Sequence, residues 1–128
     1  MQVSEAESVV MDVLWEAEAG GRAPLAAEDV VAALARRQDW QEATIKTLLN
    51  RLLKKGAIRA AKDGRRYLYA PVLTRQAWLM DESEGLLQRL FDGRVAPLVA
   101  HFSRNRKLSA KDVADLRKLL EEIDDGQS

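Results

Sequence analysis

An amphipathic stretch at residues 44–56 limits what this chain can fold into more than any other feature. Its sequence is TIKTLLNRLLKKG, with cationic side chains and no anionic one. On a helix, at 100° per residue, its apolar and polar side chains separate onto two opposite arcs. The apolar arc holds Ile45, Leu48, Leu49, Leu52 and Leu53, and the polar arc holds Thr44, Lys46, Thr47, Asn50, Arg51, Lys54 and Lys55. Because the apolar arc must pack on a core, the polar arc must face outward. Gly56 is expected to end the helix.

The segments on either side of this helix complete a recognisable order of elements. Ser4 and Glu7 are spaced as a capping box, which predicts a first helix over about 4–18, and a second helix is expected over 27–37. After the amphipathic helix, two short runs flank Asp63-Gly64, a pair typical of a type I′ β-hairpin. Three helices followed by a hairpin predict a winged helix-turn-helix.

From Thr74 onward the pattern is helical only. Helices are expected over 74–93, over 94–102 and, opened by Ser109 and Asp112 in capping-box register, over 109–125. A chain of 128 residues suits one compact domain with a helical extension better than two full domains. We therefore predict a mainly α fold, with a winged-helix domain at 1–73 and a helical dimerisation domain at 74–128.

Charge is balanced overall but unevenly distributed. The chain has 20 Lys and Arg and 20 Asp and Glu, yet residues 36–66 contain ten cationic side chains and only three anionic ones. The sequence contains no cysteine, no secretory signal at its start and no run of ~20 apolar residues, so we expect a cytoplasmic protein.

The polar arc carries the side chains that read bases in the major groove of double-stranded DNA. Arg and Lys reach guanine, Asn pairs with adenine and a Thr methyl contacts thymine. The predicted base-reading residues are Thr44, Lys46, Thr47, Asn50 and Arg51, and the predicted phosphate contacts are Lys54, Lys55, Lys62, Arg65 and Arg66. The alternative is that this arc is a solvated cationic face, or that the winged helix is an interaction module that docks on an acidic protein partner.

The C-terminal helices contain more apolar side chains than so short an arm can bury by itself. A homodimer would cover them and would pair two recognition helices for a palindromic site. The predicted dimer interface consists of Leu86, Leu87, Leu90, Phe91, Leu98, Val99, Phe102, Leu116, Leu119, Leu120 and Ile123. The alternative is that the arm folds back onto the winged helix.

Catalysis finds little support in the sequence. His101 is the only histidine and lies beside Phe102 in an apolar run, where we expect a packed imidazole rather than a general base. No set of residues suited to nucleophilic catalysis or metal binding can be assembled around it, so we expect neither an enzyme nor a cofactor. The tryptophans Trp15, Trp40 and Trp78 are expected in the core or in an interface.

Four segments together resemble the penicillinase-repressor family, also written BlaI/MecI/CopY. They are SEAESVVMDVLW, QDWQEATIKTLLNRLLKKGAI, KDGRRYLYAPV and GRVAPLVAHF, and the similarity extends from Ser4 to about Ile123. The resemblance implies a dimeric bacterial transcriptional repressor, with recognition-helix positions at Thr44, Lys46, Thr47 and Arg51. It also implies inverted-repeat operators with TACA and TGTA cores.

The resemblance also implies how such a repressor is inactivated. In this family a membrane sensor-protease pathway leads to cleavage of an Asn-Phe bond in the dimerisation arm, and the matching position here is His101-Phe102. These two residues are the candidate cleavage site, although His replaces Asn. The alternative is release by a small-molecule ligand. The family's copper-responsive branch carries a C-terminal cysteine motif that this chain lacks, and Gln41 replaces the usual Ser near the start of the third helix.

Overall fold

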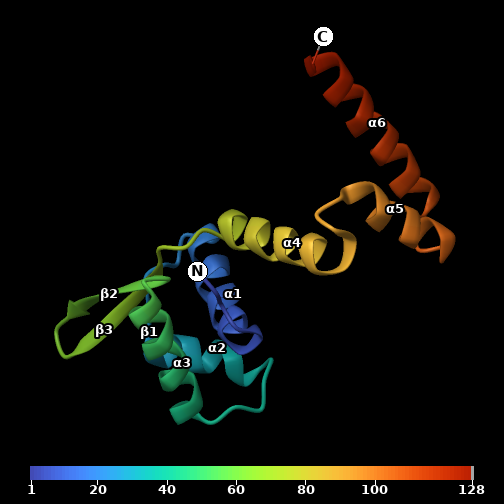
Figure 1. Ribbon diagram of the computed structural model, residues 1–128. Coiled ribbons are helices and arrows are strands. Elements are labelled where there is room, and N and C mark those ends of the chain that lie inside the picture. Colours follow the sequence, from blue (N-terminus) through green and yellow to red (C-terminus); the bar gives the residue numbers. More distant parts are fainter. Residues whose placement is uncertain (128) are drawn as a thin grey trace. The chain divides into compact units, whose positions relative to one another are not determined.

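The computed structural model describes residues 1–127, and Ser128 lies outside the described residues. Along these residues the elements are α1 (Glu5–Ala19), β1 (Leu25–Ala26), α2 (Ala27–Ala35), α3 (Glu42–Lys55), β2 (Ile58–Asp63), β3 (Arg66–Pro71), α4 (Arg75–Phe91), α5 (Val95–Arg104) and α6 (Ala110–Gln127). The fold is mainly helical with a small antiparallel sheet, which confirms the predicted winged helix-turn-helix followed by a helical region (Figure 1).

Helix α1 begins at the predicted capping box. The Ser4 hydroxyl accepts the Glu7 N–H at 3.1 Å, and the Glu7 carboxylate accepts the Ser4 N–H at 2.8 Å. These two bonds satisfy donors that the first turn of a helix would otherwise leave unpaired. The same motif opens α6, where Ser109 and Asp112 exchange two bonds of 3.0 Å.

Helix α3 has the amphipathic arrangement that its sequence predicts. Ile45, Leu48, Leu49 and Leu52 are buried and Leu53 is partly buried, whereas every residue of the polar arc is exposed. Gly56 ends the helix with φ of 77°, a left-handed conformation that glycine adopts without steric strain.

The strands form one antiparallel sheet in the order β1-β3-β2. Strand β1, which the sequence analysis did not identify, pairs Leu25 with Tyr69 and Ala26 with Leu68. The β2–β3 pairing ends at Asp63 opposite Arg66, so the two loop residues are Gly64 and Arg65 rather than Asp63 and Gly64. Only Gly64 of these two has a positive φ, so the expected type I′ turn is wrong, because that turn needs a positive φ at both positions.

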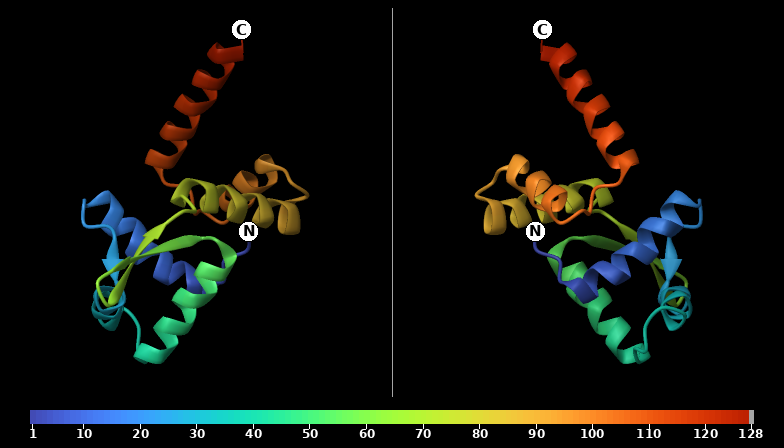
Figure 2. Two further views of the ribbon diagram at one scale, coloured as in Figure 1. Left: turned by 90° about the vertical axis from the view of Figure 1, so that its left-hand side faces the viewer. Right: turned by 90° about the vertical axis from the view of Figure 1, so that its right-hand side faces the viewer.

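The core lies among α1, α2 and α3, with the hairpin beside them (Figure 1, Figure 2). Its largest fully buried apolar side chains are Met11, Leu14, Leu34, Ile45, Leu49, Leu52, Val10 and Val30. The Trp15 indole N–H donates to the Leu73 carbonyl at 2.8 Å, and the Trp78 ring packs 5.4 Å from the Trp15 ring. Trp40 also packs against this core, so all three tryptophans lie where the sequence places them.

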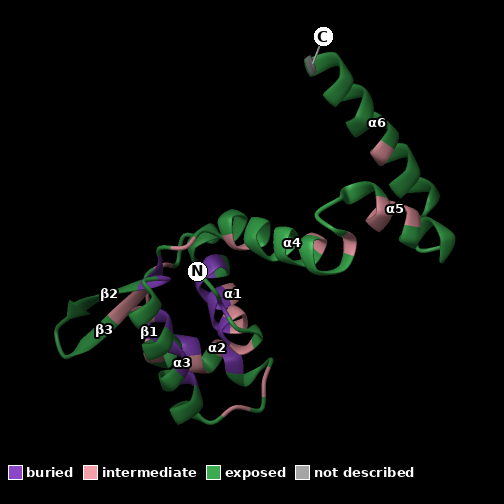
Figure 3. Cartoon of the chain, in the orientation of Figure 1, coloured by how far each residue is buried: buried purple, intermediate pink, exposed green. Residues whose placement is uncertain are grey.

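The chain separates into two compact units, Met1–Met80 and the residues from Asp81 onward. The first unit extends seven residues beyond the boundary expected after Leu73, because the first turns of α4 bring Trp78 onto the core. In the second unit, α4 ends where Asp92 and Gly93 adopt φ of 51° and 76°, and Pro97 lies in the first turn of α5, where it is tolerated. Figure 3 shows buried positions in α1, α2 and α3, whereas α6 is almost entirely exposed.

Candidate nucleic-acid interface

The outward face of α3 presents a polar surface. Thr47 is exposed and donates its hydroxyl to the Ala43 carbonyl at 2.9 Å. Lys46 lies 3.6 Å from Glu42, one turn earlier. Asn50 and Arg51 are exposed and have no hydrogen-bond or ion-pair partner among residues 1–127, so both side chains are available to an external ligand.

The hairpin carries a second group of cations. Lys62, Arg65 and Arg66 are all exposed, and Arg65 occupies the turn itself. Arg66 makes ion pairs with Glu28 at 3.2 Å and with Asp63 at 3.6 Å. Exposed pairs of this kind contribute about 0–1 kcal/mol, so a phosphate can replace these carboxylates at little expense in free energy.

A shallow cleft of about 240 Å³ lies between the start of α3 and the hairpin. Lys46 and Arg66 both line it, together with Glu28, Glu42, Tyr67 and Tyr69. The two cations, which the sequence assigns to different roles, therefore border the same cleft. The alternation of the two tyrosines with Arg66 and Leu68 in the sequence is typical of a strand and gives no information about the neighbouring helix.

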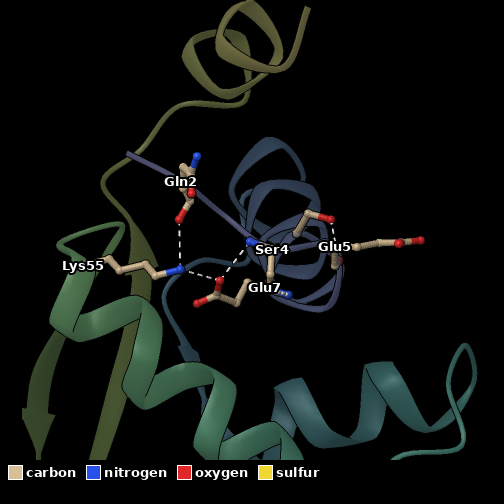
Figure 4. A network of polar contacts seen from close by, with 6 residues as sticks. Gln2, Ser4, Glu5, Glu7 and Lys55 are labelled. Carbon is tan, nitrogen blue, oxygen red and sulfur yellow. Dashed lines mark hydrogen bonds and ion pairs between the residues drawn. The ribbon is translucent and has the colours of Figure 1, made fainter. Parts of the chain in front are cut away.

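The two lysines at the end of α3 differ, although the sequence predicts the same phosphate contact for both. Lys54 is exposed and has no partner within the described part of the chain. The Lys55 ammonium instead lies 2.5 Å from a Glu7 carboxylate oxygen and 2.8 Å from the Gln2 carbonyl (Figure 4). The expectation that Lys55 projects freely outward is therefore corrected by its contacts: its ammonium is bound by the protein itself.

Glu7 is the buried member of this pair, with its side chain 2% exposed. Burial raises the pKa of its carboxyl, but the hydrogen bonds from Lys55 and Ser4, together with the Lys55 charge, outweigh burial and lower the pKa below its ordinary value. Glu7 is therefore ionised at neutral pH and provides Lys55 with a full negative charge.

The apolar side chains of the second unit are largely uncovered within a single chain. No residue of α4 or α5 is buried. Of the predicted interface residues, Leu87, Phe91, Leu98, Val99 and Leu116 are partly buried, and Leu86, Leu90, Phe102, Leu119, Leu120 and Ile123 are exposed. Leu90 and Leu120 are 59% and 61% exposed, so these two large apolar side chains have little cover within a single chain.

The candidate cleavage bond, His101-Phe102, lies inside α5. Both residues are exposed, and the imidazole lies 6.2 Å from the Phe91 ring and 5.7 Å from the Phe102 ring. The expected packed imidazole is thus only partly correct, because His101 contacts aromatic rings while remaining accessible to solvent.

Among residues 1–127, no three His, Cys, Asp or Glu side chains gather closely enough to hold a metal ion. In the same residues, none of the helices combines the length and the apolar character needed to cross a bilayer.

Comparison with known proteins identifies the family. A family profile described as penicillinase repressor matches residues 3–122, almost the whole chain. The chain belongs to the penicillinase-repressor family. Its relatives include the penicillinase repressor of Bacillus licheniformis, at 32% identity over 94% of this chain and 91% of that protein. The methicillin resistance regulatory protein MecI of Staphylococcus aureus (strain N315) is 27% identical over 93% of each chain.

Two solved structures of the repressor BlaI match about three fifths of this family member. The solution structure of the DNA-binding domain of the repressor BlaI aligns with a TM-score of 0.52 at 34% identity, covering 59% of this chain and 87% of that chain. The monomeric form of Bacillus licheniformis BlaI in complex with the blaP half-operator aligns with a TM-score of 0.50 at 34% identity, covering 60% and 88%. These relatives place the chain among DNA-binding transcriptional repressors.

Proposed function

We propose that this chain is a cytoplasmic repressor that binds a palindromic operator as a homodimer, with α3 of each subunit in a major groove. The observation that carries the proposal is the exposed face of α3, where Asn50 and Arg51 have no partner among the described residues. Together with Lys62, Arg65 and Arg66 of the β2–β3 hairpin, which forms the wing, this face supplies both base readers and phosphate contacts. The genes it represses are proposed to include those for β-lactam resistance, as the names of its relatives suggest.

The base-reading role of α3 is tested by Arg51→Ala. If Arg51 reads a guanine, fluorescence anisotropy with the DNA upstream of the chain's own gene should show a loss of about 1–3 kcal/mol and relaxed preference at one position per half-site. Gln38→Ala, a change between α2 and α3, is the control and should leave binding unchanged. Unchanged affinity of the Arg51 variant, in a folded protein, would show that Arg51 reads no base. Absence of binding by the wild-type protein would favour the alternative of a protein-interaction module.

The homodimer is proposed because the apolar residues of α4, α5 and α6 need a partner surface. Leu120→Glu changes a side chain that is already 61% exposed, so it should not disturb the packing of a single chain. Sedimentation velocity should show monomers, and binding to a full palindrome should fall to the affinity of a half-site. Lys118→Glu, about 200° away around α6, introduces the same carboxylate on the opposite, already charged face and should leave the dimer intact.

Release by proteolysis at His101-Phe102, through a membrane sensor protease, is also proposed. The bond is exposed but helical, so cleavage would require α5 to unwind locally. Cells treated with a β-lactam should then contain a fragment that ends near residue 101, detectable by immunoblotting. An intact chain with derepressed target genes would instead favour release by a small-molecule ligand.

A further inference from the structure

The N-terminal end of α1 is joined to the C-terminal end of α3 by a partly buried ionic contact, in which the Glu7 side chain is 2% exposed and the Lys55 side chain 37%. Lys55, the last residue of α3, donates to the Glu7 carboxylate at 2.5 Å and to the Gln2 carbonyl at 2.8 Å. Figure 4 shows its side chain reaching from α3 toward both acceptors. Glu7 and Lys55 are 48 residues apart in the sequence, so this contact is tertiary.

The capping box of α1 fixes the position of the Glu7 carboxylate independently of Lys55. The same oxygen that binds Lys55 also accepts the Ser4 N–H, within the capping box of α1. The second oxygen is buried and has no hydrogen-bond partner within residues 1–127, so Lys55 supplies the compensating charge. A buried carboxylate that loses its only cation is strongly disfavoured. The α3 end is therefore held by a directional contact in addition to the apolar packing of its inner face.

The neighbouring residues show what this contact positions. Gly56 turns the chain immediately after Lys55, and β2 of the wing begins at Ile58. The exposed Lys54 and Arg51 lie on the last turns of the same helix. A shift of the α3 end would move these cations, together with the root of the wing, relative to any DNA that the helix contacts.

We propose that Glu7 and Lys55 are positioning residues, which set the orientation of α3 for sequence recognition, and that Lys55 makes no phosphate contact. This inference rests on the proposed DNA-binding function. It distinguishes two adjacent lysines that a sequence pattern treats as equivalent: Lys54 faces solvent, whereas Lys55 faces Glu7.

The experiment compares Lys55→Met with Lys54→Met in the full-length protein. The probes are a duplex selected by the wild-type protein from a randomised pool and a scrambled duplex of the same base composition. Affinities are measured by fluorescence anisotropy over a range of salt concentrations. The temperature is kept well below the lowest thermal unfolding midpoint among the variants. A phosphate contact contributes about 0.9 to the slope of log affinity against log salt concentration, and it acts on all sequences alike.

The two lysine variants should lose different properties. Lys54→Met should weaken binding to both duplexes and flatten the salt slope by about 0.9. Lys55→Met should leave the slope and the affinity for the scrambled duplex unchanged, but should reduce the preference for the selected duplex by about tenfold. Arg37→Met, which removes an exposed pair with Glu16, is the control for loss of an ion pair in the same unit and should preserve the preference.

Glu7→Gln keeps the acceptor oxygen for Ser4 and removes the charge that holds Lys55. It should reduce the preference in the same direction, and the double variant should lose no more than Lys55→Met alone, because both changes break one contact. The double variant should also be more stable to heat than Lys55→Met, since no unpaired buried charge remains. Lys55→Arg, which keeps the cation, should restore part of the preference and provides a folded protein if the methionine variant unfolds.

Two outcomes would overturn the inference. A flatter salt slope with equal loss on both duplexes would show that Lys55 touches DNA. An unchanged preference in folded Lys55→Met and Glu7→Gln proteins would show that the pair stabilises the fold only. If the wild-type protein selects no sequence from the pool, the proposed function fails instead.

Discussion

Trp78 offers a quantitative test of where the N-terminal unit ends. Although it lies in α4, its ring is 5.4 Å from that of Trp15 at an interplanar angle of 43°. Replacing a fully buried tryptophan with alanine costs about 3–5 kcal/mol, and an aromatic pair contributes about 0.5–1.5 kcal/mol of such a loss. Because Trp78 is only partly buried and its indole N–H has no acceptor among the described residues, we expect Trp78→Ala to cost about 2 kcal/mol, from packing alone.

Urea unfolding followed by tryptophan fluorescence is suited to this test, because all three tryptophans belong to the first unit. With an m-value of about 1 kcal/mol/M for a domain of this size, the midpoint should fall by about 2 M. Gln76→Ala, an exposed change in the same turn of α4, should leave the midpoint unchanged. If Trp78→Ala weakened self-association but did not move the midpoint, Trp78 would belong to the arm and the boundary would lie at Leu73.

Three further changes test the wing, a turn and a buried charge. Arg65→Ala should weaken binding to every duplex alike and flatten the salt slope by about 0.9, without changing the unfolding midpoint. Gly56→Ala should destabilise the protein by about 1 kcal/mol in chemical unfolding, because φ is 77° there, whereas Gly85→Ala, in α4, should be neutral or stabilising. The pKa of Glu7 is lower in the folded chain than its ordinary value of 4.5, so the ionised carboxylate stabilises the fold at pH values above 4.5. This stabilisation is lost as the pH falls below 4.5 and through the lowered pKa. Acid unfolding should therefore be steeper for the wild type than for Glu7→Gln.

Local patterns were sufficient for most of the fold. The α3 wheel and the Ser4–Glu7 and Ser109–Asp112 capping boxes each depend on residues a few positions apart, so the sequence alone shows both partners. Strand β1 cannot be predicted from the sequence, because two residues are too few to show a periodicity. The hairpin turn was misplaced by one residue, since Asp-Gly favours a type I′ turn and only the pairing of Asp63 with Arg66 reveals the alternative.

The candidate site was predictable by face but not by contact. The polar arc of α3 follows from helical geometry, and all of its residues are exposed, although the Lys55 ammonium is bound by Glu7 and Gln2. The ion pairs of Lys55 with Glu7 and of Arg66 with Glu28 depend on where segments distant in the sequence meet in the fold. No local spacing of residues predicts these pairs. Glu7 was identified from the sequence for its local capping role, and the structure adds its long-range one.

The sheet also gives the wing a gradient of stiffness. Strand β1 pairs with Leu68 and Tyr69 in the middle of β3, and the root pair of Ile58 with Pro71 is buried, while the exposed pairs Lys62 with Tyr67 and Asp63 with Arg66 have no third strand beside them. The outer ribbon should therefore bend and twist more readily than its base, and its amide protons should exchange with solvent sooner. In the proposed complex with DNA, a compliant tip on a fixed root would let the hairpin adapt to grooves of different width while α3 keeps its place.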